Sequence, residues 1–312
     1  MTENMLTGYE GLSNEELIES FLGKYRSLQT RKVYRSELLK FNRFIKKPFD
    51  KVSKRDMMDY NKVMDTKSDA TRQRIYATLR AMFKWLEWAG IIDDKENPVK
   101  GTFERLTPEL NIASKCLEVE EIKALEATGW DDALDYAMVA VLSTTGVRIR
   151  ELVNMKWTDC FRKYDTKTGT NDWFVNVLGK GNKYRDCFLP VGTVAALVRL
   201  RNGQQIDPSL DEPIFTRLYT KKIGKFTPEG ARRRLEDLAV RAGITKPFTP
   251  HWFRHTFVSQ AIDNGANPRD VQYSAGHSSF RSTEKYMWLM GKKVGNFFPV
   301  QFGRLDSAKQ EN

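Results

Sequence analysis

The sequence is poor in the residues that support covalent cross-links. Its 312 residues include three cysteines, Cys116, Cys160 and Cys187, which are far apart and form no CxxC pair. This odd, scattered set excludes a disulfide-built scaffold and favours a reducing compartment. The N-terminus lacks the basic and apolar segments of a signal peptide. No apolar run approaches the ~20 residues that span a bilayer, so we expect no membrane partner and a cytoplasmic protein.

Two further absences limit the chemistry. The sequence contains no GxxxxGK[ST] loop for binding a nucleotide. Asp131, Asp132 and Asp135 lie close together, but they are better explained as the first turn of a helix than as ligands of a two-metal site. We therefore expect neither a cofactor nor a metal.

Positive charge, by contrast, is abundant and unevenly distributed. The chain has 51 Lys and Arg against 40 Asp and Glu, a formal net charge of +11. Residues 24–84 hold 18 of these bases and six acids, whereas the first 23 residues hold five acids and no base. A solvated surface usually mixes signs, so the excess favours a phosphate-binding surface over one that is merely soluble.

The first ~95 residues predict a bundle of four short amphipathic helices. Ser13 and Glu16 form a capping box for the first helix, and Ser53 caps the third. Pro48 ends the second helix and Gly90 closes the fourth. The polar faces carry the candidate phosphate contacts Arg31, Lys32, Arg35, Arg43, Arg72, Arg74 and Lys84.

The remaining chain predicts a linker, a second domain and a tail. We expect an N-terminal domain over 1–95, a polar linker over 96–115, a second domain over 116–290 and a tail over 291–312. In the second domain, three strands form a small antiparallel sheet near 160–162, 173–178 and 184–189. Helices are expected at 118–127, 131–145, 148–154, 191–201, 228–242, 250–264 and 268–275. The predicted fold class is mainly α with a small antiparallel β-sheet.

All three histidines of the chain fall within a short stretch of the second domain. His251, Arg254 and His255 lie at i, i+3 and i+4 in TPHWFRHTF and share one helical face. A His-x-x-x-His pair can bind zinc, but the zincin pattern needs Glu where Trp252 stands, and no cysteine lies nearby. A helix with surface His and Arg residues is the plainer alternative.

Two other segments carry reactive groups. In TTGVRIREL, Arg148 and Glu151 lie one turn apart at the start of a helix, where a carboxylate can fix a guanidinium; an ordinary surface ion pair is the alternative. In SAGHSSFRSTEKYMWL, a helix ends at Gly276, His277 follows in a tight loop, and Tyr286 comes nine residues later. Considered alone, Tyr286 is typical of a core aromatic.

Together these motifs resemble the tyrosine recombinases, also called the phage integrase family. The resemblance rests on TGVRIREL, HWFRH, GH followed by Tyr nine residues on, and the lysine of VLGKGNKYR, and it covers residues 117–290. The basic bundle before them is similar to the family's core-binding domain at the level of architecture. The departures are mild: Ala275 and Phe253 stand where Leu is common, and the interval from Arg148 to Lys180 is long.

The resemblance implies a site-specific DNA recombinase. Such an enzyme cleaves and rejoins duplex DNA by transesterification through a 3′-phosphotyrosyl intermediate, without ATP or metal, and serves DNA recombination and integration, including that of mobile elements. Tyr286 would be the nucleophile. Arg148 and Arg254 would hold the non-bridging oxygens with permanently charged forks, and His277 would be a further donor.

The remaining implied roles concern protons and support. Lys180 would protonate the departing 5′ oxygen, and His251 would accept the tyrosine proton or hold it in place. Glu151 would orient Arg148, and His255 would give structural support. The seven basic residues of the bundle would contact DNA.

The resemblance also implies how the protein assembles. We expect a monomer free in solution, a homotetramer on paired DNA sites, and association with the nucleoid when bound. The apolar tail either packs on its own domain or docks on a neighbouring subunit. A type IB topoisomerase is an alternative, disfavoured by the GH box, the bundle and the tail. A catalytically idle DNA-binding or architectural protein is another, disfavoured by the complete set of reactive residues.

Overall fold

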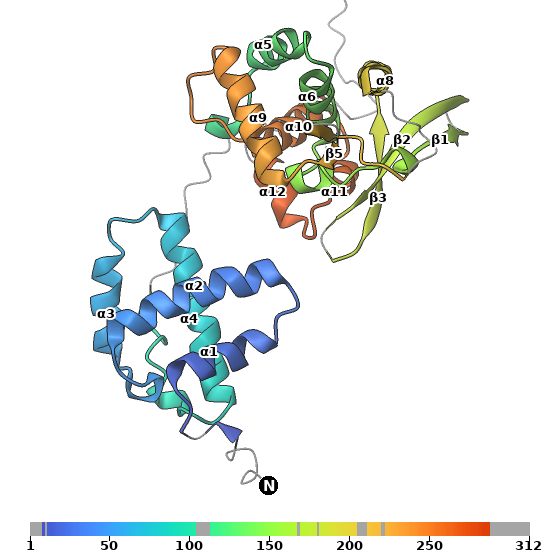
Figure 1. The fold of residues 1–312 in the computed structure, drawn as a ribbon. Coiled ribbons are helices and arrows are strands. Elements are labelled where there is room, and N and C mark those ends of the chain that lie inside the picture. Colours follow the sequence, from blue (N-terminus) through green and yellow to red (C-terminus); the bar gives the residue numbers. More distant parts are fainter. Residues whose placement is uncertain are drawn as a thin grey trace, which may run out of the picture. The chain divides into compact units, whose positions relative to one another are not determined.

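The structure is a computed structural model of the chain, and it consists of two compact units (Figure 1). The units are Met1–Glu109 and Leu110–Asn312. The described residues are 8–9, 11–103, 113–166, 169–179, 181–204, 211–219 and 222–287.

The described part of the first unit is helical. Capping boxes at Ser13 and Ser53 begin α1 and α3, as the sequence predicts, and Ser27 caps α2. Lys46 adopts a left-handed conformation and ends α2 just before Pro48. The elements are α1 (Asn14–Gly23), α2 (Leu28–Ile45), η2 (Phe49–Lys51), α3 (Lys54–Val63), α4 (Asp69–Trp88) and η3 (Asp94–Glu96).

The first core is rich in aromatic side chains. Phe21, Phe41 and Phe83 are fully buried among Leu, Ile and Met residues of the four helices. Val99 and Phe103 are also buried in this core, and the Phe103 ring stacks on Tyr76 at 4.1 Å between centroids. The polar stretch that we assigned to the linker therefore contains a segment, residues 97–103, that packs on the first unit.

The second unit combines helices with a small sheet. Its elements before the sheet are η4 (Ala113–Lys115), α5 (Val119–Gly129), α6 (Ala133–Thr145), α7 (Ile149–Leu152) and η5 (Trp157–Asp159). The strands are β1 (Cys160–Asp165), β2 (Thr170–Leu178) and β3 (Tyr184–Leu189), then β4 (Thr216–Tyr219) and β5 (Lys222–Lys225). The later helices are α8 (Val191–Gln204), α9 (Pro228–Arg241), α10 (His251–Asp263), α11 (Pro268–Ala275) and α12 (Arg281–Met287).

The three-stranded sheet is antiparallel in the order β1-β2-β3. Alternate residues of each strand point to opposite faces, so Val175 and Val177 of β2 and Cys187 and Leu189 of β3 are buried in the core. The separate β4–β5 ribbon was not predicted, because its four-residue strands are rich in Lys and Arg and show no apolar alternation. The predicted fold class, mainly α with a small antiparallel sheet, is confirmed.

Helix α10 lies at the centre of the second unit. It contacts α6, α11 and α12, and its Trp252, Phe253 and Val258 are buried. A smaller apolar cluster joins α10 to α11 and α12 through Val258, Val271 and Tyr286. This packing brings segments that are far apart in sequence to one place. Among the helices that the structure describes, none has the length and hydropathy needed to cross a bilayer.

Candidate active site

The turn between α6 and α7 positions Arg148. Arg148 is the N-cap of α7, and the Glu151 carboxylate accepts hydrogen bonds from its backbone N–H at 2.9 Å and from its guanidinium Nη1 at 2.8 Å. The guanidinium Nη2 donates to the Gly276 carbonyl oxygen at 3.1 Å. Two anchors thus fix the orientation of Arg148, while its side chain stays 36% exposed. The capping-box geometry is what places the predicted Arg148–Glu151 pair.

Arg254 is a buried cation with little compensation. It is 2% exposed, and its Nη1 donates to the Gly146 carbonyl oxygen at 2.9 Å. Its Nη2 is buried and has no hydrogen-bond partner within the described parts of the chain. Burial, with the nearby charge of Arg148, lowers the pKa of Arg254 to about 10, so the group remains charged at neutral pH. A buried, unpartnered guanidinium nitrogen is costly, which makes the site receptive to an anion.

The end of α11 positions His277. Gly276 takes the left-handed conformation (φ +64°), and the His277 backbone N–H returns to the Gln272 carbonyl oxygen at 3.0 Å. This C-cap turns the chain so that His277 follows directly after the carbonyl that Arg148 contacts. His277 Nδ1 lies 2.8 Å from the Thr283 hydroxyl oxygen. The GH motif is therefore a helix cap that carries an imidazole into the site.

Tyr286, on α12, reaches the same place from the end of the described chain. The residue is 4% exposed, and its hydroxyl oxygen lies 2.6 Å from His255 Nδ1. Its ring lies parallel to that of His277 within 15°, with centroids 6.4 Å apart. Burial raises the pKa of Tyr286 to about 12, against the opposing charge of Arg254.

The two histidines of α10 lie side by side, and one of them contacts Tyr286. The rings of His251 and His255 meet edge to face with centroids 4.6 Å apart. Partial desolvation and the charges of Arg254 and Arg148 lower the pKa of His251, which favours its neutral form. His255, expected to give structural support, is the imidazole in hydrogen-bond contact with Tyr286.

One buried residue at the site was not predicted. Arg185 on β3 is 5% exposed and donates from Nη2 to Glu151 Oε2 at 2.7 Å and from Nε to the Ser274 carbonyl oxygen at 2.8 Å. Burial acts to raise the pKa of Glu151, but the bonds and charge of Arg185, with those of Arg148, outweigh it and leave that pKa low. The sequence does contain one signal for Arg185. The residue alternates along β3 with Cys187 and Leu189, which places it on the buried face of the strand.

The second unit thus gathers most of the predicted site. One region contains Arg148, Glu151, His251, Arg254, His255, His277 and Tyr286. Lys180, in the turn between β2 and β3, lies outside the described residues, as does the tail. In the described segments, no three His, Cys, Asp or Glu side chains gather as metal ligands would.

The predicted DNA contacts lie on α2 and α4 of the first unit, and several already have partners there. Arg31 donates to the carbonyl oxygen of Tyr25 at 2.6 Å and to that of Gly23, the last residue of α1, at 3.1 Å. Arg74 pairs with the buried carboxylate of Glu37 at 3.1 Å. Arg35 pairs with Glu19, Arg43 donates to the Leu39 carbonyl oxygen, and Arg72 lies near Asp65 and Asp69. Lys32 and Lys84 are exposed.

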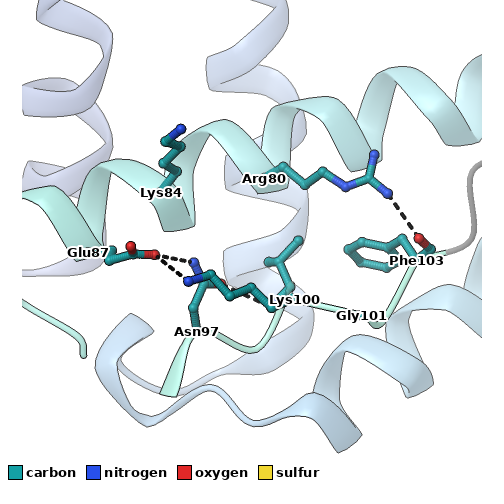
Figure 2. A pocket seen from close by; sticks show the side chains of 8 residues that line it. Arg80, Lys84, Glu87, Asn97, Lys100, Gly101 and Phe103 are labelled. Carbon is teal, nitrogen blue, oxygen red and sulfur yellow. Dashed lines mark hydrogen bonds and ion pairs between the residues drawn. The ribbon is translucent and has the colours of Figure 1, made fainter. Parts of the chain in front are cut away.

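A basic pocket of about 380 Å³ lies where α4 meets the segment 97–103 (Figure 2). Arg80, Lys84 and Lys100 line it. Figure 2 shows Arg80 donating to the Phe103 carbonyl oxygen, at 3.0 Å, and Glu87 accepting from Asn97 and Lys100. Three cations against one acid make this pocket part of the basic surface of the first unit.

The second unit brings a buried arginine and a buried tyrosine together with three histidines in one site, and these are the groups of a phosphoryl-transfer enzyme. The model of the phage integrase family matches residues 115–290, and that of the phage integrase N-terminal SAM-like domain matches 18–90. The chain belongs to the phage integrase family. As a tyrosine recombinase, it cleaves and rejoins DNA strands.

Curated relatives are similar over most of the chain. It is 30% identical to tyrosine recombinase XerC of Leptospira interrogans over 228 residues, 72% of this chain and 69% of the relative. It is 30% identical to tyrosine recombinase XerD of Listeria innocua over 229 residues, 70% of this chain and 72% of the relative. It is 28% identical to tyrosine recombinase XerC of Staphylococcus aureus, over 92% of this chain and 93% of the relative.

Solved structures share the fold. The XerH recombinase in a post-cleavage complex with a palindromic difH substrate has a TM-score of 0.71 and 18% identity, covering 91% of this chain and 84% of that one. A lambda integrase fragment bound as a dimer to a core site has a TM-score of 0.69 and 16% identity, covering 93% and 98%.

Proposed function

We propose that the chain is a site-specific recombinase whose nucleophile is Tyr286. The observation that carries the proposal is the buried Nη2 of Arg254, which has no partner within the described residues and lies in the same site as Arg148 and Tyr286. A DNA phosphate is an anion that would satisfy this nitrogen. Site-specificity and the residue roles below are part of the proposal.

The proposed cleavage is one in-line displacement. The Tyr286 oxygen forms a bond to phosphorus, and the bond from phosphorus to the 5′ oxygen breaks, leaving a 3′-phosphotyrosyl link and a free 5′ hydroxyl. Arg148, Arg254 and His277 donate to the non-bridging oxygens, where negative charge grows in the transition state. Because the covalent link conserves the phosphoester, rejoining needs no ATP, and the chemistry assigns no step to a metal.

Two protons move in this step. With a pKa of about 12, only about one Tyr286 phenol in 10⁵ is ionised at pH 7, so a proton acceptor is needed. The 2.6 Å contact supports His255 as the acceptor. His251, which we expected to accept or hold this proton, lies against the His255 ring and would support it. Lys180 would give a proton to the departing 5′ oxygen.

The two units would divide the work. The first unit, with its excess of basic residues, would hold the DNA duplex, and the second would cut it. The protein would be a monomer when free and a tetramer on two paired sites, with the tail docked in cis or in trans. It would act in the cytoplasm, on the nucleoid.

The test is covalent capture from a random duplex library. The full chain is incubated with duplexes carrying randomised segments, denatured with SDS, and the DNA retained on protein is sequenced. We expect enrichment of one sequence, cleaved with protein on its 3′ phosphate, and none with Tyr286→Phe, which should still bind duplex DNA.

Two outcomes would replace the proposal. Covalent capture of all sequences alike, with relaxation of plasmids and no strand exchange, would indicate a type IB topoisomerase. Binding without any covalent product would indicate an idle DNA-binding protein.

A further inference from the structure

Arg185 is buried at the site yet forms no part of the proposed phosphate grip. Its guanidinium makes a two-pronged contact with Glu151, at 2.7 Å to Oε2 and 3.3 Å to Oε1, and its Nε binds the Ser274 carbonyl oxygen at 2.8 Å. It is therefore held on one side by α7 and on the other by the end of α11. Because Arg185 is 5% exposed and its Nε, Nη1 and Nη2 all donate within the unit, it is poorly placed to touch DNA.

The Glu151 carboxylate is shared between two arginines. Oε1 accepts from Arg148 at 2.8 Å and from Arg185 at 3.3 Å, while Oε2 accepts from the Arg148 backbone N–H at 2.9 Å and from Arg185 at 2.7 Å. The Arg148 side chain is 36% exposed, whereas those of Arg185 and Glu151 are 5% and 6% exposed. The three groups together carry one net positive charge, and only Arg148 presents it outward.

We infer that Arg185 is a positioning residue that keeps Arg148 available to the scissile phosphate by balancing the charge of Glu151. This inference rests on the proposed function. Without Arg185, Arg148 would be the one cation hydrogen-bonded to the buried carboxylate among the described residues, and the pair would be neutral. In that case Glu151 would orient Arg148 but would also cancel its positive charge. With Arg185 present, the three groups keep one net positive charge, so Glu151 orients Arg148 without neutralising it.

Arg185 also shapes the turn that carries His277. A Cβ built on Gly276 would lie 2.8 Å from the Arg185 guanidinium carbon, so the guanidinium packs flat against this backbone. The same Gly276 provides the carbonyl oxygen that Arg148 binds. Arg185 is thus packed between the two segments whose arginine and histidine are proposed to grip the phosphate.

The test compares a charged with a neutral scissile phosphate. Suicide duplexes carry the enriched site with either a normal phosphodiester or a methylphosphonate, in which a methyl group replaces one non-bridging oxygen. Arg148→Ala is the reference: it should slow cleavage of the phosphodiester strongly and of the neutral analogue much less. Arg185→Met should follow the same pattern, about 10²-fold on the phosphodiester and under about tenfold on the methylphosphonate, with DNA affinity unchanged.

Two further variants separate charge balance from folding. Arg185→Lys keeps the cation and should cleave the phosphodiester within about tenfold of wild type. Arg185→Met combined with Glu151→Gln removes both buried charges, so it should cleave faster than Arg185→Met alone. Equal slowing of both substrates by Arg185→Met, or a double variant slower than the single one, overturns the inference. A phosphodiester rate unaffected by Arg148→Ala overturns the proposed function itself.

Discussion

At the scale of single residues, the site holds groups in states that folding alone does not favour. Arg254 is a buried cation with one hydrogen bond to a carbonyl oxygen and one nitrogen without a partner in the described chain. Tyr286 is a buried phenol whose pKa is raised to about 12. Such groups are retained at a cost in stability when they serve a ligand or a reaction.

Arg254→Met tests this trade directly. The substitution removes an uncompensated buried charge and fills most of its volume, so the free energy of unfolding should fall by no more than about 1 kcal/mol, or rise. Cleavage should drop by at least about 10²-fold, because the substitution removes a proposed donor to the transition state. Urea unfolding and suicide-substrate cleavage measure the two effects. A loss of several kcal/mol with cleavage intact would make Arg254 a structural residue.

His255→Ala tests the proton acceptor. We expect cleavage to slow by about 10²- to 10⁴-fold, because the Tyr286 proton loses its proposed acceptor, which lies in hydrogen-bond contact with the hydroxyl. A substrate whose departing 5′ oxygen is replaced by sulfur needs no proton at that atom, so it should rescue Lys180→Ala but not His255→Ala. Rescue of His255→Ala by sulfur would show that this imidazole acts at the leaving group.

At the scale of elements, helix ends position residues of the candidate site. The N-cap of α7 holds Arg148, and the left-handed C-cap of α11 presents Gly276 and His277. Gly276→Ala should cost more than the ~1 kcal/mol of left-handed strain, because its Cβ would meet Arg185. Gly243→Ala is the matched control, because Gly243 has φ +76° and open space around it. Its free energy of unfolding should fall only by the cost of the left-handed strain. Equal losses of unfolding free energy would contradict the packing.

Glu151 makes the stability of the fold pH-dependent. Its pKa in the folded chain is lowered, so its carboxylate stabilises the fold above the ordinary glutamate pKa of about 4.3, and this contribution is lost as pH falls through the folded-state value. Glu151→Gln should therefore be less stable than wild type at about pH 7 and lose that deficit at low pH. Unfolding in urea across this range checks the sign, and Glu120→Gln, an exposed site on α5, should track wild type throughout.

How far the elements follow from sequence depends on how local their signals are. The helix caps at Ser13 and Ser53 and the apolar spacing of α2 are local, and the predicted helices form there. The convergence of Arg148, Arg254, His277 and Tyr286 was reached through the family motif, because no spacing in the chain encodes a contact between distant segments. Arg185 and the His255–Tyr286 bond exist only once β3, α10, α11 and α12 pack together.

At the scale of the whole molecule, positive charge is concentrated in residues 24–84 of the first unit, which hold 18 Lys and Arg against six Asp and Glu. Part of this charge is used internally: Arg74 compensates Glu37, which is 5% exposed. Composition therefore indicates a basic unit but overstates how many of its cations are available to DNA. The polar composition of residues 97–103 likewise led us to assign them to a linker, whereas Val99 and Phe103 are buried in the core of the first unit.

Lys32→Ala combined with Lys84→Ala tests the DNA-binding surface. Both lysines are exposed, so duplex affinity should weaken, and the slope of log affinity against log salt should become shallower by about one for each DNA phosphate that is no longer neutralised. The free energy of unfolding should not change. Arg74→Ala is the contrast: it should destabilise the fold, because it leaves buried Glu37 without that partner. A salt slope unchanged in the double variant would place the DNA-binding surface elsewhere.

The central claim, that the arginines and histidines of one site serve the Tyr286 hydroxyl, is tested most directly by mapping the covalent bond. A nicked duplex of the enriched sequence is cleaved, the adduct is digested, and the DNA-bearing peptide is sequenced by mass spectrometry. The account predicts a 3′ phosphate on Tyr286, formed by wild type, formed at least about 10²-fold more slowly by Arg254→Met, and absent with Tyr286→Phe. A DNA-bearing peptide with another residue modified, or an adduct that persists in Tyr286→Phe, would contradict it.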